Sequence, residues 1–297
     1  MVKIAVIGGT GLDNPEFMSN IKPVPAPFQT PYGPTTDSIT SGVVNGVEVV
    51  LIGRHGKNHR NPPSSINYRA NIYAINHPDM LGCDAIIATN AVGSLRADKH
   101  QVGDLVLVDQ FIDFTAHGGG QRGPHTFFDN VKGHMEGLVH CPMAEPFCKP
   151  IRRLLYKSTH EEGIRCHYGG CCVVIEGPRF SSKSEHKMFK CWGGDIINMT
   201  MVPEVCLANE LGIPYATIAL ITDLDSGIDE EDDNLSDNDE NKPVDESVTH
   251  NQVLENMKKF APGAARTIAR AIVDIANLDF KKLHNGKSSH ETPRALI

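Results

Sequence analysis

Several features that would assign the chain to a class are missing from its sequence. Its eight cysteines include no CxxC pair and no regular spacing, which disfavours a zinc site and favours reduced thiols. No window holds the about 18 apolar residues that a membrane span requires, and the apolar run at residues 4–7 is too short for a signal peptide. Basic residues do not cluster as they do on nucleic-acid-binding faces. We therefore expect a cytoplasmic protein, with the nucleus as the alternative, that binds no metal, membrane or nucleic acid.

What the chain does contain is typical of a globular protein, apart from one acidic segment. With 297 residues, 40% hydrophobic and 22% charged, it can bury a large core as one α/β domain or two smaller ones. Residues 229–246 hold ten acidic residues and one lysine, which accounts for the net charge of −8. Such a segment buries too little apolar surface to order itself, so it predicts a mobile surface insertion. Residues 281–297 are polar and predict a frayed C-terminal tail.

Strand-like apolar runs alternate with helical patterns, which predicts an α/β fold with one central sheet. Strands are predicted at 3–7, 47–52, 85–88, 105–108, 171–175, 195–197 and 215–221. Helices are predicted at 65–75, at 145–162, from Ser182 with a capping box to Glu185, around Pro203, at 248–261 and at 264–278. We expect one domain over residues 1–280, with 229–246 as its insertion. The loop 114–134 contains histidines 117, 125 and 134 without metal-ligand spacing, so none is assigned a role.

Two of the predicted strands end in groups suited to an anion. The first runs into Gly8-Gly9-Thr10-Gly11, where backbone N–H groups and the Thr10 hydroxyl can approach an anion, although a simple tight turn is the alternative. The second runs into Arg54 and His55. The planar fork of Arg54 can bind an oxyanion bidentately and His55 can add a donor, which favours an anion site over a solvated loop.

The last predicted strand ends in two carboxylates, Asp223 and Asp225. Because ligands bind beyond the carboxyl ends of strands in open α/β sheets, both are candidates for protonating or hydrogen-bonding a ligand. Asp is also common in helix caps and turns, which is the alternative interpretation. On residue chemistry alone, the chain is an α/β protein that binds an anion and a second ligand.

A set of motifs in order along the chain resembles the trimeric purine nucleoside phosphorylase family, on the branch that acts on 5′-methylthioadenosine. The motifs are Gly8-Gly9-Thr10-Gly11, Arg54-His55-Gly56, Asn90-Ala91-Val92-Gly93-Ser94, residues 142–147, Glu176-Gly177-Pro178-Arg179-Phe180-Ser181, Asn198-Met199-Thr200 and Thr222-Asp223-Leu224-Asp225. The resemblance implies a single α/β domain whose central mixed sheet, or distorted barrel, is flanked by helices. It also implies a homotrimer.

The resemblance further implies phosphorolysis, in which inorganic phosphate attacks C1′ of a nucleoside and the purine departs. This reaction needs an oxyanion cradle and an acid for the leaving group, and phosphate is a co-substrate, so no cofactor is implied. The implied phosphate-binding residues are Thr10, Arg54, His55, Asn90, Ala91 and Thr200, with His59 near the entrance. The implied substrate-binding residues are Phe180, Ser181, Met199, Asp223, Asp225, His250, Val253 and, from a neighbouring subunit, His140.

Asp223 and Asp225 are the implied catalytic residues. Asp223 protonates N7 of the purine, and burial together with the charge of Asp225 should raise its pKa from the ordinary value near about 4. Asp225 and Ser181 help to recognise a 6-amino group. The resemblance implies Asn in place of Asp223 in members that take 6-oxopurines, so 6-aminopurine nucleosides are expected here.

Two positions depart from the methylthioadenosine branch. Asn90 stands where Thr is usual, and His250 stands where a small apolar residue lines the methylthio pocket. A histidine there can bind a 5′-hydroxyl, so adenosine is the alternative to methylthioadenosine. Three rival functions stay open: a 6-oxopurine nucleoside phosphorylase, a phosphate-independent nucleosidase and a nucleoside-binding protein without turnover.

Overall fold

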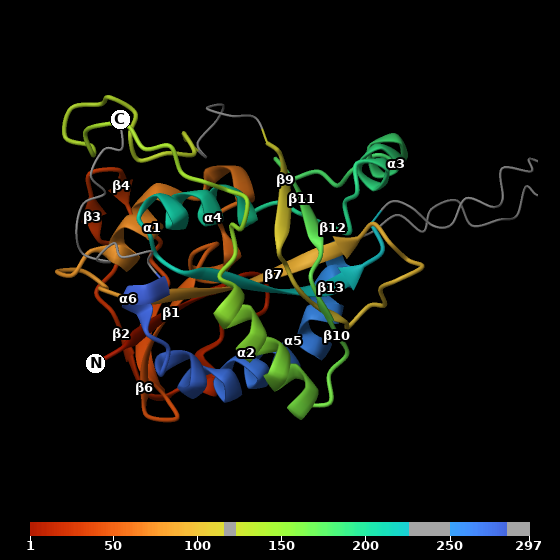
Figure 1. Cartoon of the computed structure of the whole chain (residues 1–297), viewed down its shortest axis with the longest axis horizontal. Helices are drawn as coiled ribbons and strands as arrows, with labels where there is room; N and C mark the ends of the chain where they lie inside the picture. The colour runs from red at the N-terminus through yellow and green to blue at the C-terminus, as the bar shows by residue number, and fades with distance from the viewer. Residues whose placement is uncertain (116–122, 226–249, 284–297) are drawn as a thin grey trace, which may run out of the picture.

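The computed structural model describes residues 1–115, 123–225 and 250–283 (Figure 1). The expected insertion at 229–246, His117 and residues 284–297 of the expected tail lie outside the described residues. The described part confirms an α/β fold with a mixed central sheet flanked by helices. No helix in it combines the length and apolarity that crossing a bilayer requires.

The described residues form an 11-stranded sheet in the order β10-β8-β13-β7-β1-β6-β5-β2, with β12, β11 and β9 branching from β7. Its strands are β1 (Lys3–Gly8), β2 (Ser19–Pro23), β5 (Ile39–Val44), β6 (Val47–Gly53), β7 (Ala85–Ser94), β8 (Leu105–Leu107), β9 (Gln110–Phe114), β10 (Cys166–Tyr168), β11 (Cys171–Ile175), β12 (Ile196–Asn198) and β13 (Tyr215–Asp223). A separate hairpin consists of β3 (Gln29–Thr30) and β4 (Gly33–Pro34). Strands β1, β6, β7 and β13 run parallel, so their carboxyl ends meet at one edge.

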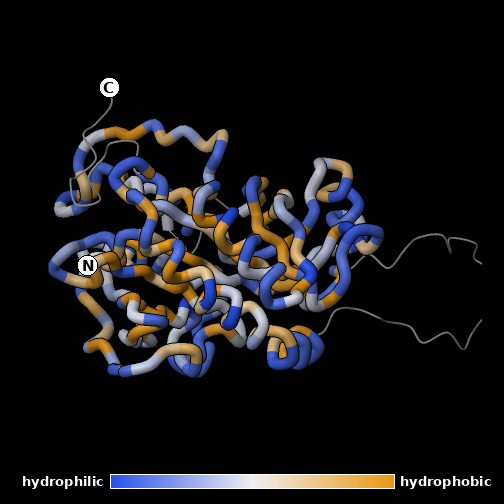
Figure 2. The backbone as a smooth tube through the Cα atoms, turned by 60° about the horizontal axis from the view of Figure 1, so that its bottom comes forward, coloured by the Kyte–Doolittle hydropathy of each residue, from blue (hydrophilic) through white to orange (hydrophobic). Residues whose placement is uncertain are grey.

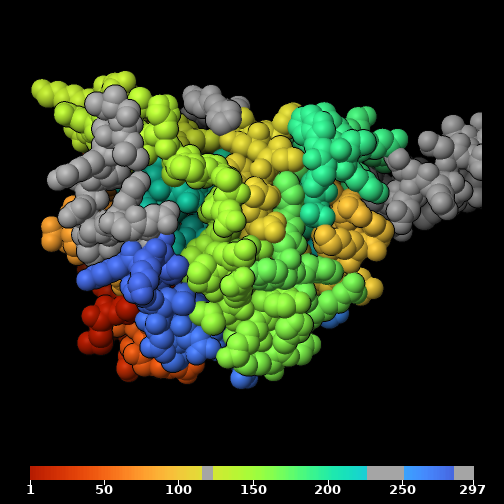
Figure 3. Space-filling model, in the orientation of Figure 1, coloured from red at the N-terminus to blue at the C-terminus, as the bar shows by residue number. Residues whose placement is uncertain are grey.

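Helices cover both faces of the sheet. They are α1 (Tyr68–Asn76), α2 (Lys149–Glu161), α3 (Lys183–Cys191), α4 (Met201–Glu210), α5 (His250–Ala276) and α6 (Phe280–Leu283), with short 3-10 turns at Pro15–Phe17, Lys57–His59 and Pro63–Ser65. Helices α1 and α4 pack on one face, and α2 and α5 pack on the other (Figure 1). In the space-filling view, α2 lies beside α5 (Figure 3).

The central strands are apolar along their whole length because both of their faces are covered. In β1, Ala5 and Ile7 face the cluster under α1 and α4, while Ile4 and Val6 face the cluster under α2 and α5. Figure 2, in which the chain is coloured by the hydropathy of each residue, shows hydrophobic residues concentrated in the interior and hydrophilic residues in the outer turns. A sheet buried on both faces gives its exposed strand ends a rigid support.

Strand β7 is longer than predicted, and this changes the setting of Asn90. The predicted strand stops at residue 88, but β7 continues to Ser94 because it pairs with β13 as far as Gly93 and with β12 at Gly93 and Ser94. Asn90 therefore lies inside a central strand rather than in the loop that follows one.

The two helices predicted at 248–261 and 264–278 form one helix, α5, with Pro262 inside it. Proline removes one backbone donor. However, Met257, Ala261, Ala264 and Ile268 continue a single apolar face that packs on the sheet. Burial of this face outweighs the local cost of the proline, so the prediction of a break was wrong.

Two further helices begin later than predicted. Helix α2 starts at Lys149 rather than 145, because Cys148 is extended and its N–H donates to the Tyr215 carbonyl at 2.7 Å. Helix α1 starts at Tyr68 rather than 65, because the Asn67 side chain caps it by accepting from the Ala70 N–H at 3.2 Å. The capping box between Ser182 and Glu185 at the start of α3 is confirmed.

Candidate functional site

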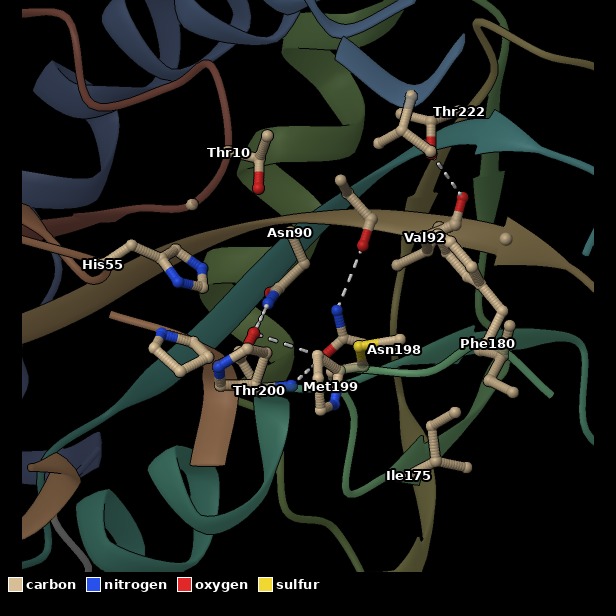
Figure 4. A pocket seen from close by; sticks show the side chains of 18 of the residues that line it. Thr10, His55, Asn90, Val92, Ile175, Phe180, Asn198, Met199, Thr200 and Thr222 are labelled. Atoms are coloured by element: carbon tan, nitrogen blue, oxygen red, sulfur yellow. Dashed lines mark hydrogen bonds between the residues drawn. The ribbon is translucent and has the colours of Figure 1, made fainter. Parts of the chain in front are cut away.

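A cavity of about 380 Å³ lies at the carboxyl ends of β1, β6, β7 and β13 (Figure 4). It is lined by most of the residues proposed from the sequence, namely Thr10, Arg54, His55, His59, Asn90, Ala91, Phe180, Ser181, Met199, Thr200, Asp223, Asp225 and Val253. In Figure 4, Thr10, His55 and Thr200 lie toward one end, and Phe180 and Ile175 toward the other. The fold thus brings together residues from strands and strand ends that are far apart in the chain.

Two of the proposed residues are not placed in this cavity. His140 does not line the cavity of its own chain. His250 is the first residue of α5, but its side chain lies outside the described residues. The prediction that His250 reads a 5′-hydroxyl therefore stays a prediction.

Arg54 is held by a carboxylate of the protein itself. Its Nε and Nη2 donate to the two carboxylate oxygens of Glu204 on α4, with 2.9 Å between Nη2 and Oε2, and Nη1 donates to the Thr89 carbonyl at 3.0 Å. Burial opposes the charge of Arg54, but the Glu204 carboxylate outweighs burial and raises its pKa. Glu204 occupies the edge of the guanidinium formed by Nε and Nη2, and the prediction that Arg54 binds an oxyanion bidentately stays a prediction. Of its five N–H groups, these three contacts leave two for a ligand.

His55 presents an acceptor to the cavity rather than the predicted donor. Its Nδ1 donates to the Asn61 carbonyl at 2.8 Å, and its ring stacks on His59 with 4.0 Å between centroids. Burial, followed by the charges of His59 and Arg54, lowers the pKa of His55 to about 3. Nε2 therefore carries a lone pair near neutral pH. It can accept a hydrogen bond from a protonated phosphate oxygen or a hydroxyl.

A chain of side-chain hydrogen bonds fixes the hydroxyl of Thr200. Thr217 on β13 donates to Asn90 Oδ1 at 2.7 Å. Asn90 Nδ2 in turn donates to Thr200 Oγ1 at 3.0 Å (Figure 4). Asn198 accepts from the backbone N–H groups of Thr200 and Met201, both at 2.7 Å. Thr200 Oγ1 accepts from Asn90, and its own proton is donated to Asn198 Oδ1 only across a long 3.4 Å contact, so an anion in the cavity can take this proton instead.

Asp223 is the last residue of β13 and borders the opposite end of the cavity. Burial raises the pKa of Asp223 above its ordinary value, and the charge of Asp225 adds to the rise, although the Thr222 hydroxyl and the Asp225 N–H oppose it. The predicted direction is confirmed. Gly93 on β7 makes room for this carboxyl, since a Cβ there would lie 2.6 Å from Asp223 Oδ1.

Asp225 lies deeper, and it is held by two side chains. It is 3% exposed and adopts a left-handed backbone with φ of 50°, a region that Asp tolerates better than most residues. Ser181 Oγ lies 2.6 and 2.7 Å from its two carboxylate oxygens. His186 on α3 lies with Nδ1 2.8 Å from Oδ2. The two carboxyl groups of the site therefore have different surroundings.

Apolar side chains form the walls between the two polar ends. Met199, Ile197 and Val253 line the cavity, and Phe180 closes one side while remaining 38% exposed. Gly177, with φ of +70°, allows the chain to pass Met199, since a Cβ there would lie 2.6 Å from its sulfur. A flat apolar ligand with an anion at one end and a basic nitrogen at the other fits this arrangement.

Several residues that shape the site were missed by sequence reasoning: Thr89, His186, Glu204 and Thr217. All are buried polar residues within helices or strands. The signal that could have identified Glu204 and His186 is a charged or titratable side chain on the apolar face of a predicted helix, because such groups are buried only with a partner.

Comparison with known proteins identifies the class to which this fold and cavity belong. Residues 3–273 match the family described as the Phosphorylase superfamily, so the chain belongs to that family. The resemblance seen in the motifs is confirmed.

More specific relatives are the S-methyl-5′-thioadenosine phosphorylases of Xenopus tropicalis, 41% identical with 95% of this chain and 92% of the relative covered, and of Danio rerio, 41% identical with 100% and 97% covered. A solved structure of methylthioadenosine phosphorylase from Schistosoma mansoni in complex with adenine has a TM-score of 0.81 at 36% identity, with 96% of each chain covered. A mutant adenosine/methylthioadenosine phosphorylase from the same organism, in complex with methylthioadenosine, has a TM-score of 0.78 at 35% identity, with 96% of this chain and 95% of that chain covered.

Proposed function

We propose that the protein catalyses phosphorolysis of 5′-methylthioadenosine to adenine and 5-methylthioribose 1-phosphate. The observation that carries the proposal is a single cavity with hydroxyl and amide donors at one end and a carboxyl of raised pKa, Asp223, at the other. Membership of the phosphorylase family and the substrates named for its relatives support it.

In the proposed reaction, a phosphate oxygen forms a bond to C1′ while the bond from C1′ to N9 breaks. The electron pair of that bond goes to the purine, and Asp223 transfers its proton to N7, so that adenine leaves neutral. Asp225 and Ser181 accept hydrogen bonds from the 6-amino group and so orient the purine. Phe180 and Met199 flank the base and the sugar. No protein nucleophile is needed, and we assign no cofactor beyond phosphate as co-substrate.

Phosphate occupies the opposite end in this proposal. The hydroxyls of Thr10 and Thr200 donate to it, the Asn90 and Ala91 segment of β7 lies against it, and Arg54 contributes its remaining N–H groups. The neutral ring of His55 accepts from a protonated phosphate oxygen, which favours the monoanion over the dianion in the initial complex.

Adenosine is the second candidate substrate. Asn90 departs from the methylthioadenosine pattern, and one solved relative is named an adenosine/methylthioadenosine phosphorylase. We also propose a homotrimer in which His140 reaches the 5′ end of the ligand of a neighbouring subunit. The position of His140 away from its own cavity supports this arrangement.

Purine release tests the proposal directly. Methylthioadenosine, adenosine and inosine are each incubated with the protein with and without phosphate, and the free base is measured by its absorbance. We expect adenine release only with phosphate, fastest from methylthioadenosine. Fastest release from inosine would overturn the role of Asp223, release without phosphate would indicate a nucleosidase, and no release from any substrate would indicate a binding protein.

A further inference from the structure

The anion end of the cavity holds little uncompensated positive charge. Of the described residues that line the cavity, only Arg54 and Arg60 are arginine or lysine. Arg54 is buried and paired with Glu204, so its charge is already balanced inside the protein. His55 is neutral near neutral pH, because burial lowers its pKa to about 3. An anion that leaves water needs a partner of opposite charge, and Arg60 is the remaining arginine that can provide it.

Arg60 stands at the mouth of the cavity, beside residues of the phosphate end. Its side chain is 63% exposed and yet lines the cavity. The preceding residue, His59, stacks on His55, and its Nε2 lies 3.4 Å from Thr10 Oγ1. The following residue, Asn61, donates its N–H to the His55 carbonyl at 3.0 Å, and its own carbonyl accepts from His55 Nδ1. The backbone of Arg60 is therefore fixed next to two residues that are proposed to bind phosphate.

The turn that carries Arg60 has an unusual backbone. Two successive residues, Asn58 and His59, have φ of 59° and 53°, in the left-handed region that few residues other than glycine adopt. Gly56 also has a positive φ, of 73°. Backbone of this kind concentrates at ligand-binding sites, where the surrounding structure maintains it. The shape of the turn thus agrees with a role in binding for the residues that it presents to the cavity.

A carboxylate outside the cavity binds the guanidinium of Arg60. Nη2 of Arg60 donates to Asp37 Oδ2 at 2.6 Å, while its Nε and Nη1 have no hydrogen-bond partner within the described ranges. Asp37 does not line the cavity, and its other oxygen, Oδ1, accepts from the Lys57 N–H at 3.0 Å. Exposed ion pairs of this kind contribute little to stability. An anion that reaches the cavity can therefore displace Asp37 as the partner of Arg60.

We propose that Arg60 is a further phosphate-binding residue, which exchanges its ion pair with Asp37 for one with phosphate when phosphate enters the cavity. Its planar guanidinium can then donate two parallel N–H groups to two phosphate oxygens. The inference rests on the proposed function, because that function places phosphate beside Thr10 and His55. It adds a residue that supplies the balancing charge, and a carboxylate of the protein that competes with phosphate for this residue.

Substitutions of the two partners should shift phosphate affinity in opposite directions. Arg60→Gln should raise the dissociation constant for inorganic phosphate about tenfold, near the lower limit for a hydrogen bond to a charged group. Asp37→Asn removes the competing charge and keeps an oxygen for the Lys57 N–H. It should lower the constant about two- to fivefold, the range of exposed ion pairs. Weaker phosphate binding in both variants would mean that the pair only holds the turn together, and would overturn the proposal.

Lys57→Gln is the matched control for nonspecific attraction. Lys57 belongs to the same turn and is exposed, but it does not line the cavity. The control loses the same charge as Arg60→Gln. We expect its phosphate dissociation constant to stay within about twofold of wild type, because salt screens exposed charges that make no contact. An equal loss of affinity in the two variants would mean that the turn attracts phosphate only through its overall charge, which contradicts a direct contact with Arg60.

A double variant shows whether Asp37 acts through Arg60. In the Arg60→Gln background, Asp37→Asn should no longer improve phosphate affinity, because the competing ion pair is already absent. The same improvement in both backgrounds would show a general effect of negative charge and would reject the exchange of partners. The melting temperature of each variant should stay near that of wild type, since the pair is exposed. A fall in melting temperature that parallels the lost affinity would show a structural role only.

Calorimetric titration with inorganic phosphate at constant ionic strength separates this inference from the proposed function. Phosphate should bind Asp37→Asn most tightly, wild type and Lys57→Gln about equally, and Arg60→Gln most weakly. This order supports the role of Arg60 even if no nucleoside releases its purine, an outcome that would reject the proposed reaction alone. Unchanged phosphate affinity in Arg60→Gln, alongside phosphate-dependent release of adenine by wild type, would reject the role of Arg60 alone.

Discussion

The two ends of the cavity are built in different ways. At the anion end, Arg54, Asn90 and Thr200 belong to the core network, and each makes side-chain contacts with a neighbouring strand or helix. At the opposite end, Asp223 and Asp225 stand where β13 ends and carry the titratable chemistry. At one end the charge of Arg54 is therefore balanced by Glu204, whereas at the other end burial raises the pKa of Asp223. We expect substitutions at the first end to affect stability or phosphate affinity and those at the second to affect turnover.

Asp223→Asn should have the largest effect. The amide cannot donate an acidic proton to N7, so we expect kcat for methylthioadenosine to fall by about 10²- to 10⁴-fold, the usual contribution of general acid catalysis. The KM for phosphate should change little. Purine release measured at saturating phosphate checks the first expectation, and a phosphate titration checks the second. Loss of less than about tenfold, well below that range, would assign the acid role elsewhere.

Glu204→Gln should have the next largest effect, on stability. It leaves the buried guanidinium of Arg54 without its counter-charge, which typically costs about 3–5 kcal/mol. Denaturant unfolding measures the loss. Replacing both partners, as Arg54→Met with Glu204→Leu, removes the unpaired charge and should recover most of the stability. If this double variant also binds phosphate normally, Arg54 has only a structural role, and the hydroxyls of Thr10 and Thr200 would be the main phosphate-binding groups.

Thr200→Val should have a smaller effect that is confined to phosphate. The shape of the side chain is kept, but the hydroxyl that Asn90 orients is lost, so we expect the KM for phosphate to rise about tenfold, as for one hydrogen bond to a charged group. Thr217→Val is the matched control. It removes the hydroxyl that donates to Asn90, and Thr217 does not line the cavity. This variant should therefore lower the stability of the protein more than it changes the KM for phosphate. If Thr217→Val raised the KM for phosphate more than Thr200→Val does, Thr200 would not contact phosphate.

Sequence reasoning found the strand ends because apolar runs bounded by polar residues are read directly from the chain. It placed Thr10, Asp223 and Asp225 correctly at the cavity. It predicted β6 but missed β5, and so missed the hairpin that the two strands form. The turn between them, Asn45-Gly46 with φ of 48° and 86°, is a common two-residue hairpin signal.

The remaining features of the site depend on contacts between residues distant in the chain. Arg54 and Glu204 are separated by 150 residues, and Asp225 and His186 by 39. A sequence shows that Arg54 follows a strand, but only the packed fold shows that α4 brings a carboxylate to it. For this reason Glu204 was not predicted as a partner of Arg54. The contact between His186 on α3 and Asp225 likewise exists only in the packed fold.

A last prediction concerns stability at the reactive end and has the smallest effect. Because burial raises the pKa of Asp223 in the folded state, the folded protein holds a charged Asp223 at a cost once the pH exceeds that pKa. Asp223→Asn removes the cost, so the variant should be more stable than wild type at about pH 7 to 8 while being nearly inactive. As the pH falls through the folded pKa and then below about 3.9, the value of the unfolded side chain, the difference should vanish because both states are then protonated. Denaturation midpoints of the two proteins across this range provide the measurement. A stability difference that does not vary with pH would mean that Asp223 keeps an ordinary pKa and that the two ends of the cavity are alike in holding fixed charges.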